Sequence, residues 1–328
     1  MKKMMIGLLA AAALAGSMTV ANAGTTLRVT LQLPIKHHLG QNMTDFKKEV
    51  EAKTNGAVKI EIYPSAQLYK DKEVPQAVSS GAIEMGIASL TRFAGTVPAV
   101  DIFYVPFMFD SQEKVKKATA PGSSVRAPLD AAILKTGARV LWWQAYGSAI
   151  LLSKGGVIKM PADMKGKKVR VFGKTLGETV KVLGGSPVLM SGSKQFLAYQ
   201  RGAVDAGMTG ITAVKSRKLY EVMDNMTLTR HADIEFIVII NEKIWQGLKP
   251  EYQKVIMTAA KRVEKELRDK MNAIENGALA DVKSKINTVD LTDAERNEWR
   301  KATRPVVDAY IKNAGDLGKK LVEAAGKL

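Results

Sequence analysis

The sequence contains no cysteine. It therefore forms no disulfide, and it offers neither a thiolate nucleophile nor a cysteine ligand for a metal. Histidine is almost as scarce, since His37, His38 and His231 are the only three. None of them has the H-x-x-x-H spacing of a zinc-binding helix, and His37 and His38, as neighbours in an extended segment, are expected to face opposite ways. The sequence therefore predicts a protein without a metal site or a cofactor, and one that is not an enzyme.

Complete catalytic motifs are missing too. Residues 173–175 (GKT) end like a phosphate-binding loop, but Lys168 occupies the position where that loop requires a glycine. Ser191 and Lys194 match the S-x-x-K pattern of penicillin-interacting enzymes, whereas the companion S-D-N and K-T-G patterns are absent. A periplasmic serine hydrolase that uses Ser191 and Lys194 is therefore a minor alternative.

Long apolar runs are lacking after the N-terminus. Residues 1–23 combine two lysines, a short apolar run and a terminal Ala-Asn-Ala, which is the pattern of a secretory signal peptide cleaved after Ala23. An exported chain of this size without cysteine fits the bacterial periplasm. No later run approaches the roughly 18 apolar residues of a membrane helix, so no stable membrane insertion is expected.

A basic block is also missing, although the formal net charge is +17. Acidic and basic residues alternate, as in residues 261–270 (KRVEKELRDK). This distribution predicts a solvated surface of mixed charge and argues against nucleic-acid binding, because nucleic-acid sites cluster their basic residues. A positive field can still attract small anions to a cleft.

The sequence does contain strand-like and helix-like segments that alternate regularly along the chain. Period-2 alternation predicts strands, and apolar residues three or four apart, closed by glycine, predict helices. The resulting β-α-β order with short connections predicts an α/β fold with a largely parallel sheet. The expected strands are 26–33, 57–64, 82–89, 138–146, 149–154, 167–173, 186–190, 203–210 and 235–245, and the expected helices are 40–56, 71–81, 174–185 and 193–202.

The pattern changes in the last third of the chain. Residues 250–285 are expected to form one long helix, and residues 292–313 another, which begins with a Thr292–Glu295 capping box. No linker separates the halves, so the chain is expected to cross between two lobes more than once. The predicted organisation is lobe I from 24–146 with 236–275 returning to it, and lobe II from 147–235 with 276–328 packing on it.

Several stretches, in order along the chain, resemble the solute-binding proteins of TRAP transporters, the DctP family. They are 49–68 (EVEAKTNGAVKIEIYPSAQL), 77–89 (AVSSGAIEMGIAS), 105–113 (VPFMFDSQE), 161–171 (PADMKGKKVRV), 183–190 (LGGSPVLM), 198–206 (AYQRGAVDA) and 218–222 (KLYEV).

The resemblance implies a two-lobed periplasmic binding protein fold. Each lobe would be a mixed β-sheet flanked by helices, and the long helix of the C-terminal half would span both. It also implies a monomer that captures a small-molecule carboxylate and delivers it to the small and large TRAP membrane subunits, without chemistry. A solute-binding protein of an ABC-type or sensory system is the nearest alternative.

Arg170 is the expected carboxylate-binding residue. On a strand, Val169 and Val171 share one face and Arg170 points to the other. In the resembled family the arginine of this motif binds the carboxylate of the ligand through a bidentate salt bridge. A planar guanidinium on a rigid strand suits that role.

Other positions depart from the family pattern. A second ligand-facing arginine is replaced by residues 148–150 (SAI), a Glu-Asn pair by Met208 and Thr209, an aromatic residue by Gly192, and in some members an acid by Ser89. The departures predict a monocarboxylate, with aromatic and keto acids as candidates.

The further pocket candidates lie where expected strands end near the cleft. They are Ser89, Arg92, Gln144, Tyr146, Met208, Thr209, His38 with its neighbour His37, and Trp143 or Trp142, of which only one is expected to face the cleft.

Overall fold

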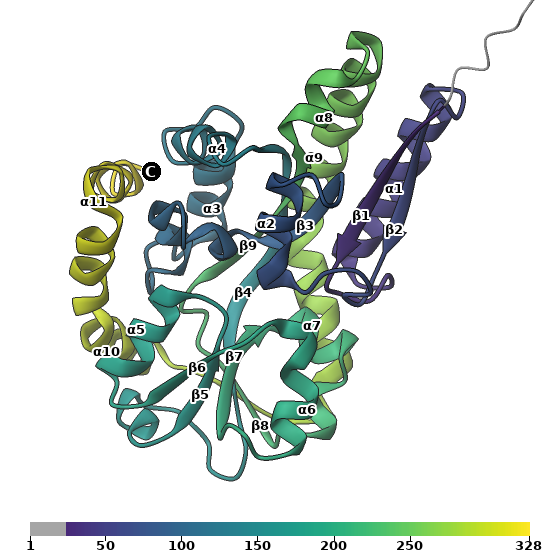
Figure 1. The fold of residues 1–328 in the computed structure, drawn as a ribbon. Helices are drawn as coiled ribbons and strands as arrows, with labels where there is room; N and C mark the ends of the chain where they lie inside the picture. The colour runs from purple at the N-terminus through teal and green to yellow at the C-terminus, as the bar shows by residue number, and fades with distance from the viewer. Residues whose placement is uncertain (1–23) are drawn as a thin grey trace, which may run out of the picture.

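The computed structural model describes residues 24–328. The predicted signal peptide and its cleavage site lie outside this range. None of the helices between Gly24 and Leu328 is long and apolar enough to cross a membrane. The predicted α/β fold is confirmed, with mixed sheets covered by helices and a long helix in the C-terminal half (Figure 1).

Lobe I is built on a mixed sheet with the strand order β2-β1-β3-β9-β4. The strands β2, β1 and β3 are parallel, as the β-α-β pattern predicts, and β9 is antiparallel to β3 and to β4. The bounds are β1 Thr25–Leu31, β2 Val58–Tyr63, β3 Met85–Ser89, β4 Ala138–Ser153 and β9 Asp233–Asn241.

Lobe II continues from the far end of β4. There β7 and β8 pair with β4 in antiparallel fashion, β5 and β6 add parallel to β7, and β10 adds parallel to β8. The bounds are β5 Lys168–Val171, β6 Ser186–Leu189, β7 Ala206–Gly210, β8 Asn225–Leu228 and β10 Asn287–Asp290.

The strand β4 joins the two lobes. The sequence analysis expected two strands here, and that expectation is wrong, because one 16-residue strand runs through both sheets. Its pairing changes partner without a break: Ser148 is the last residue opposite β9, and Ala149 is the first opposite β7. Two register irregularities, between Val140 and Trp142 and between Ala145 and Gly147, bend the strand at this crossing.

The second crossing element is α9, Pro250–Lys283. It packs against α1 of lobe I and α7 of lobe II, so the predicted lobe-spanning helix is confirmed (Figure 1). The expected single helix over 292–313 is instead two helices, because Pro305 lacks the N–H that would continue the first one. The last helix, α11, packs against η3 and α5 together.

The remaining helices are all shorter than α9. Their bounds are α1 His38–Lys53, α2 Val74–Ser79, α3 Gln112–Thr119, α4 Arg126–Leu134, α5 Lys174–Val182, α6 Gln195–Gln200, α7 Ile211–Ser216, α8 Glu242–Gly247, α10 Asp293–Thr303 and α11 Pro305–Ala325, and the 3-10 turns include η1 Asp71–Glu73, η2 Leu90–Phe93, η3 Pro98–Tyr104 and η5 Gly192–Lys194.

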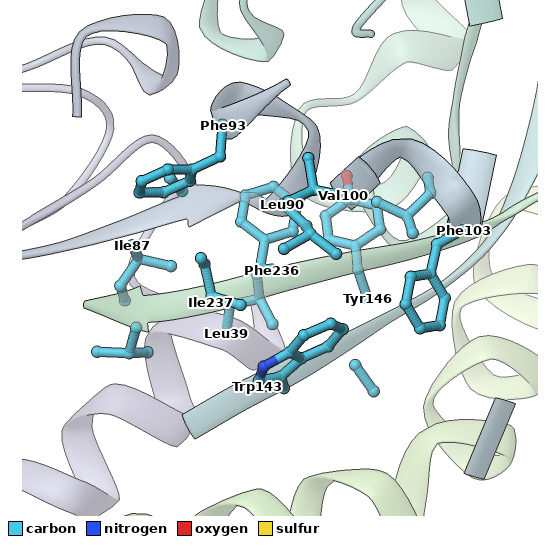
Figure 2. Close-up of a cluster of buried hydrophobic side chains, with 14 of the residues drawn as sticks. Leu39, Ile87, Leu90, Phe93, Val100, Phe103, Trp143, Tyr146, Phe236 and Ile237 are labelled. Atoms are coloured by element: carbon cyan, nitrogen blue, oxygen red, sulfur yellow. The ribbon is translucent and has the colours of Figure 1, made fainter. Parts of the chain in front are cut away.

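Both tryptophans of β4 are core residues. Trp142 packs against Phe46, with ring centroids 4.4 Å apart. Trp143 meets the edge of Phe103 at 5.4 Å (Figure 2). The expectation that one of them faces the cleft is therefore wrong. They point to opposite faces of the strand, but helices and turns cover both faces, so each side chain is fully buried.

Candidate functional site

A small cavity lies where the two lobes meet. Its volume is about 20 Å³, so a ligand of several heavy atoms requires the lobes to move apart first. Most of its lining residues are polar, and they come from both lobes. The lining residues are Gln32, Asp71, Ser89, Tyr146, Arg170, Phe172, Gly192, Gln195, Thr209, Arg217, Ile234 and Phe236.

Arg170 is the most deeply buried cation of this cavity, with only 2% of its surface exposed. Its guanidinium donates to the carbonyl of Met208 (2.6 Å) and to that of Met190 (3.0 Å). Its Nε–H has no hydrogen-bond partner among residues 24–328. Within the same residues, no carboxylate forms a salt bridge with Arg170. Burial, with the nearby charges of Arg92 and Arg217, lowers the pKa of Arg170 to about 10. The group stays charged at neutral pH and leaves one donor for an anion.

The strand explains this placement. Val169 and Val171 anchor β5 in the core, both almost completely buried, while Arg170 points from the other face into the cavity. The Phe172 ring lies 5.2 Å from the guanidinium carbon and stabilises the charge by a cation–π contact. The surroundings hold the fork rigid, which reduces the entropy lost when an anion binds.

A second polar group is organised around Asp71. This fully buried carboxylate accepts from the backbone N–H of Ser89 (2.9 Å), from the Ser89 hydroxyl (3.0 Å) and from Nε of Arg92. Ser89 lines the cavity directly, whereas Arg92 stands behind Asp71 and neutralises it. Ser89 and Arg92 were expected at the site, whereas no sequence pattern indicated Asp71, which lies in the turn before α2.

An aromatic wall closes one side of the cavity. Tyr146 stacks on Phe236, with ring centroids 5.1 Å apart (Figure 2). It also stacks on His37, with ring centroids 5.3 Å apart. Thr209 lines the cavity beside them, on β7. Tyr146 and Thr209 thus lie together with Ser89 and Arg170, as the sequence analysis expected.

Four expected site residues lie elsewhere. Gln144 donates to the Leu39 carbonyl (3.3 Å) and to Asn42 Oδ1 (2.7 Å) inside lobe I. Trp143 donates its indole N–H to Asp130 (2.8 Å), and Met208 contributes only the carbonyl that holds Arg170. His38 donates to or accepts from no cavity residue; its Nε2 lies 3.1 Å from the Ala145 carbonyl.

The histidine pair also differs from expectation. His37 and His38 begin α1 rather than an extended segment, and their rings lie side by side, 4.0 Å apart. Burial lowers the pKa of His38 to about 4 and that of His37 well below its usual range. Both rings also line a separate groove of about 810 Å³ between α1, α7 and α9. No group of potential metal ligands occurs in the part of the chain that the structure describes.

Arg217 is a second cavity-lining residue, besides Asp71, that the sequence did not point to. It follows α7 in lobe II, is half-buried, and reaches across to donate to the Gln32 carbonyl of lobe I (3.3 Å). No periodicity or motif marks it, because it lies in a helix-to-turn segment next to the "KLYEV" stretch. The only sequence signal was indirect: Gly192 replaces an aromatic residue, and Arg217 fills the space beside it.

The hydrolase alternative does not fit the geometry. The Ser191 hydroxyl is buried and has no hydrogen-bond partner in the described chain, whereas Lys194 is exposed. A serine nucleophile requires a base within hydrogen-bond reach. The two residues therefore do not form a nucleophile and its base.

A buried carboxylate of lobe I also binds a helix of lobe II. Asp101 of η3 accepts from the Thr91 hydroxyl (2.5 Å), from the Thr175 hydroxyl (2.9 Å) and from the Thr175 backbone N–H (3.1 Å). Thr175 lies in the first turn of α5, so a lobe I side chain caps a lobe II helix. This contact can form only when the lobes are closed.

Asp101→Asn should therefore shift the protein toward the open form. Exchanging charge-assisted hydrogen bonds for neutral ones costs about 1 kcal/mol, which changes the ratio of open to closed molecules about fivefold. Small-angle scattering should then give a larger radius of gyration than for the unchanged protein. The control Thr175→Ser keeps the hydroxyl donor and should not differ; identical scattering for Asp101→Asn would mean that the contact does not hold the lobes.

Comparison with known proteins agrees with this architecture. Residues 31–313 match the family described as "DctP: Bacterial extracellular solute-binding protein, family 7". A C4-dicarboxylate-binding periplasmic protein, DctP of Rhodobacter capsulatus, is 29% identical over 284 residues, which cover 84% of this chain and 83% of that protein. The 2,3-diketo-L-gulonate-binding periplasmic protein YiaO of Escherichia coli K12 is 27% identical, and the match covers 92% of each chain.

A solved structure gives the same result for the fold. The TRAP periplasmic solute-binding protein of Sulfurospirillum deleyianum, determined with bound succinate, is 25% identical and superposes with a TM-score of 0.87 over 93% of this chain and 99% of that one. The match to the family covers most of the chain and includes both lobes, β4 and α9. The chain therefore belongs to the DctP family, the TRAP-type solute-binding proteins, which bind solutes and are not enzymes.

Proposed function

We propose that this protein captures an organic acid in the cavity between its lobes, with Arg170 as the residue that binds a carboxylate. The observation that carries the proposal is the buried Arg170 guanidinium, which has an unpartnered Nε–H and no acidic partner among residues 24–328. A buried charged group without a partner costs roughly 1–3 kcal/mol or more, and an anionic ligand removes that cost. The relatives support it, because one is named for C4-dicarboxylates and another holds succinate.

The proposed roles of the other residues follow from their positions. Tyr146, Thr209 and Ser89 line the cavity and contact the ligand, and the Met208 carbonyl orients Arg170. Arg92 acts indirectly, because it neutralises Asp71. Gln144, Trp143 and His38 contact other parts of lobe I and have no part in the proposed site.

The main argument for a monocarboxylate ligand no longer holds. That expectation rested on the absence of a second arginine near Arg170, and the structure brings Arg217 into the same cavity. The proposal at this level is therefore a carboxylate of unspecified charge.

The proposal extends to the cellular role. It places the protein in the periplasm, as a monomer released by cleavage after Ala23, which hands its ligand to the small and large TRAP membrane subunits. The proposed lobes are 24–146 with 236–275, and 147–235 with 276–328. The contact of α11 with η3 adds that the C-terminal segment also touches lobe I, where the Tyr310 hydroxyl donates to the Ala99 carbonyl (2.8 Å).

A thermal-shift screen of organic acids tests the proposed function. A ligand that binds only the folded form stabilises it by about 2.7 kcal/mol at a concentration 100 times its Kd. At least one carboxylate should raise the melting temperature, and its uncharged amide should not. If no carboxylate stabilises the protein while neutral sugars or cations do, the proposal is wrong.

A further inference from the structure

All strands of the lobe II sheet end or begin at one common edge. The last residue of β4, Ser153, lies opposite the first residues of β7 and β8, Ala206 and Asn225. The starts of β10 and β6 lie beside those of β8 and β5 in the same way, and β5 begins beside the start of β7. Since β4 comes from lobe I and runs toward Ser153, this edge faces away from lobe I, at the lower end of the molecule in Figure 1.

The segments that flank this edge carry many basic side chains, which we call the basic rim. None of them forms a salt bridge with a carboxylate among residues 24–328, and all except Lys167 are exposed. The members of the basic rim are Lys154, Lys165, Lys167, Lys168, Arg201, Lys283 and Lys285.

The acidic residues at the same edge are too few to neutralise the basic rim. Asp205 accepts from the backbone N–H of Lys168, and Asp224 accepts from that of Gly155, both at 2.7 Å. Glu221 is paired with a lysine outside the rim. The edge therefore presents an excess of positive charge to the solvent, and it attracts an anionic partner.

Exposed apolar side chains accompany these charges. Val157, Val182 and Leu197 are among the large apolar side chains that the fold leaves exposed. Val157 lies in the loop after β4, and Leu197 lies one helical turn before Arg201. Val182 ends α5, next to the turn whose backbone bonds to residues 165–168. Basic and apolar groups side by side suit the surface of an anionic bilayer, where the cations meet headgroups and the apolar groups reach the acyl boundary.

The ligand cavity lies away from the basic rim. Arg170 and Thr209 lie toward the ends of β5 and β7, whereas the rim flanks the starts of these two parallel strands. A flat surface bound to the rim therefore leaves the interlobe cavity uncovered.

We propose that the basic rim is a docking surface for an anionic phospholipid bilayer, to which the protein binds peripherally. The proposal rests on the periplasmic location in the proposed function, but not on carboxylate binding. A negatively charged bilayer surface attracts each nearby Lys or Arg, and salt screens this attraction over about 8 Å at physiological ionic strength. Docking at the rim holds the protein close to the membrane while its cavity stays open to ligand.

Vesicle sedimentation tests the proposal, with the chain from Gly24 onward and no carboxylate present. One set of vesicles contains equal parts of phosphatidylglycerol and phosphatidylcholine, and the other contains phosphatidylcholine alone. At about 0.01 M salt the partition coefficient should be about tenfold or more higher for the anionic vesicles. The coefficient should fall when the salt is raised to about 0.15 M, because the Debye length shrinks from about 30 to about 8 Å.

Two double variants of equal net charge separate the basic rim from the charge of the whole protein. Lys165→Gln/Lys168→Gln removes two exposed rim lysines and should lower the partition coefficient for anionic vesicles about tenfold. Lys254→Gln/Lys261→Gln removes two exposed lysines of α9, which also lack a salt bridge in the described chain, and should lower it less than about threefold.

A second pair of variants tests the apolar contribution. Val157→Ser should lower the partition coefficient for anionic vesicles about threefold, because less apolar surface leaves water. Leu68→Ser changes an exposed apolar side chain of lobe I and should leave the coefficient unchanged.

Two results would overturn the inference. Equal partition onto the two kinds of vesicle would mean that the rim does not bind anionic lipid, and an acidic protein surface would then fit it better. Equal losses in the two double variants would mean that the charge of the whole protein acts, rather than the rim. Neither result affects carboxylate capture, which the thermal-shift screen measures without lipid, so the inference and the proposed function can fail separately.

Discussion

Arg170→Ala is expected to reduce affinity for the best carboxylate of the screen about 10- to 100-fold. A hydrogen bond to a charged group contributes about 1.5–3 kcal/mol, and 1.4 kcal/mol is a tenfold change in Kd. The guanidinium is buried, rigidly held by the carbonyls of Met190 and Met208, and has an Nε–H without a partner in the described chain. Isothermal titration calorimetry measures the loss directly.

Arg170→Lys is the matched control that tests whether the planar shape of the guanidinium matters. It keeps a positive charge but replaces the planar fork by a point charge, so its affinity should fall between those of the unchanged protein and Arg170→Ala. Stability of the ligand-free protein should change little in Arg170→Lys, since the charge stays buried. Unchanged affinity in Arg170→Ala would show that the carboxylate binds elsewhere.

Arg268→Met is expected to destabilise the protein by about 3–5 kcal/mol, because it breaks a buried ion pair and leaves one charge alone. Arg268 of α9 binds Glu235 of β9 through two hydrogen bonds, of 2.5 and 2.8 Å, and Glu235 is fully buried. Burial, together with the charge of Glu235, already raises the pKa of the neighbouring Asp233 well above its usual range. Without Arg268, Asp233 and Glu235 would have no positively charged side chain in contact with them among the described residues.

Urea denaturation at neutral pH measures the change as a lower midpoint. Arg262→Met is the control on the same helix: Arg262 pairs with Glu49 at 2.5 Å, but 39% of its side chain is exposed, so the loss should stay below about 1 kcal/mol. Because α9 packs against both lobes, the destabilisation should be cooperative and affect the whole protein. Equal midpoints for the two variants would contradict the argument.

The local elements were predictable because they depend on short-range patterns. The alternation around Val169 and Val171 predicts β5, and the Thr292–Glu295 capping box predicts the start of α10, where both hydrogen bonds of the box are present. The length of α9 follows from an uninterrupted amphipathic segment after Pro250. The split at Pro305 was missed, although the residue that causes it was visible in the sequence.

The crossing strand was harder to predict, for a physical reason. Gly147 lies in the gap between the two strands expected over 138–146 and 149–154. In the structure Gly147 has a positive φ of 105°, and a Cβ there would lie 2.6 Å from the Glu275 carboxyl group of α9. Glycine at this place permits the bend of β4 beneath α9 rather than ending the strand.

The sequence by itself determined the α/β order of the elements, the long helix after Pro250 and the position of Arg170 on the face of β5 opposite its valines. These depend on periodicity, capping and strand geometry, which act over a few residues. Only the tertiary structure decided which polar groups meet. It placed the side chains of Gln144 and Trp143 inside lobe I, away from the cavity, and it brought Arg217 beside Gly192. The charge of the cavity is therefore a tertiary property, since segments far apart in the chain each supply one group to it.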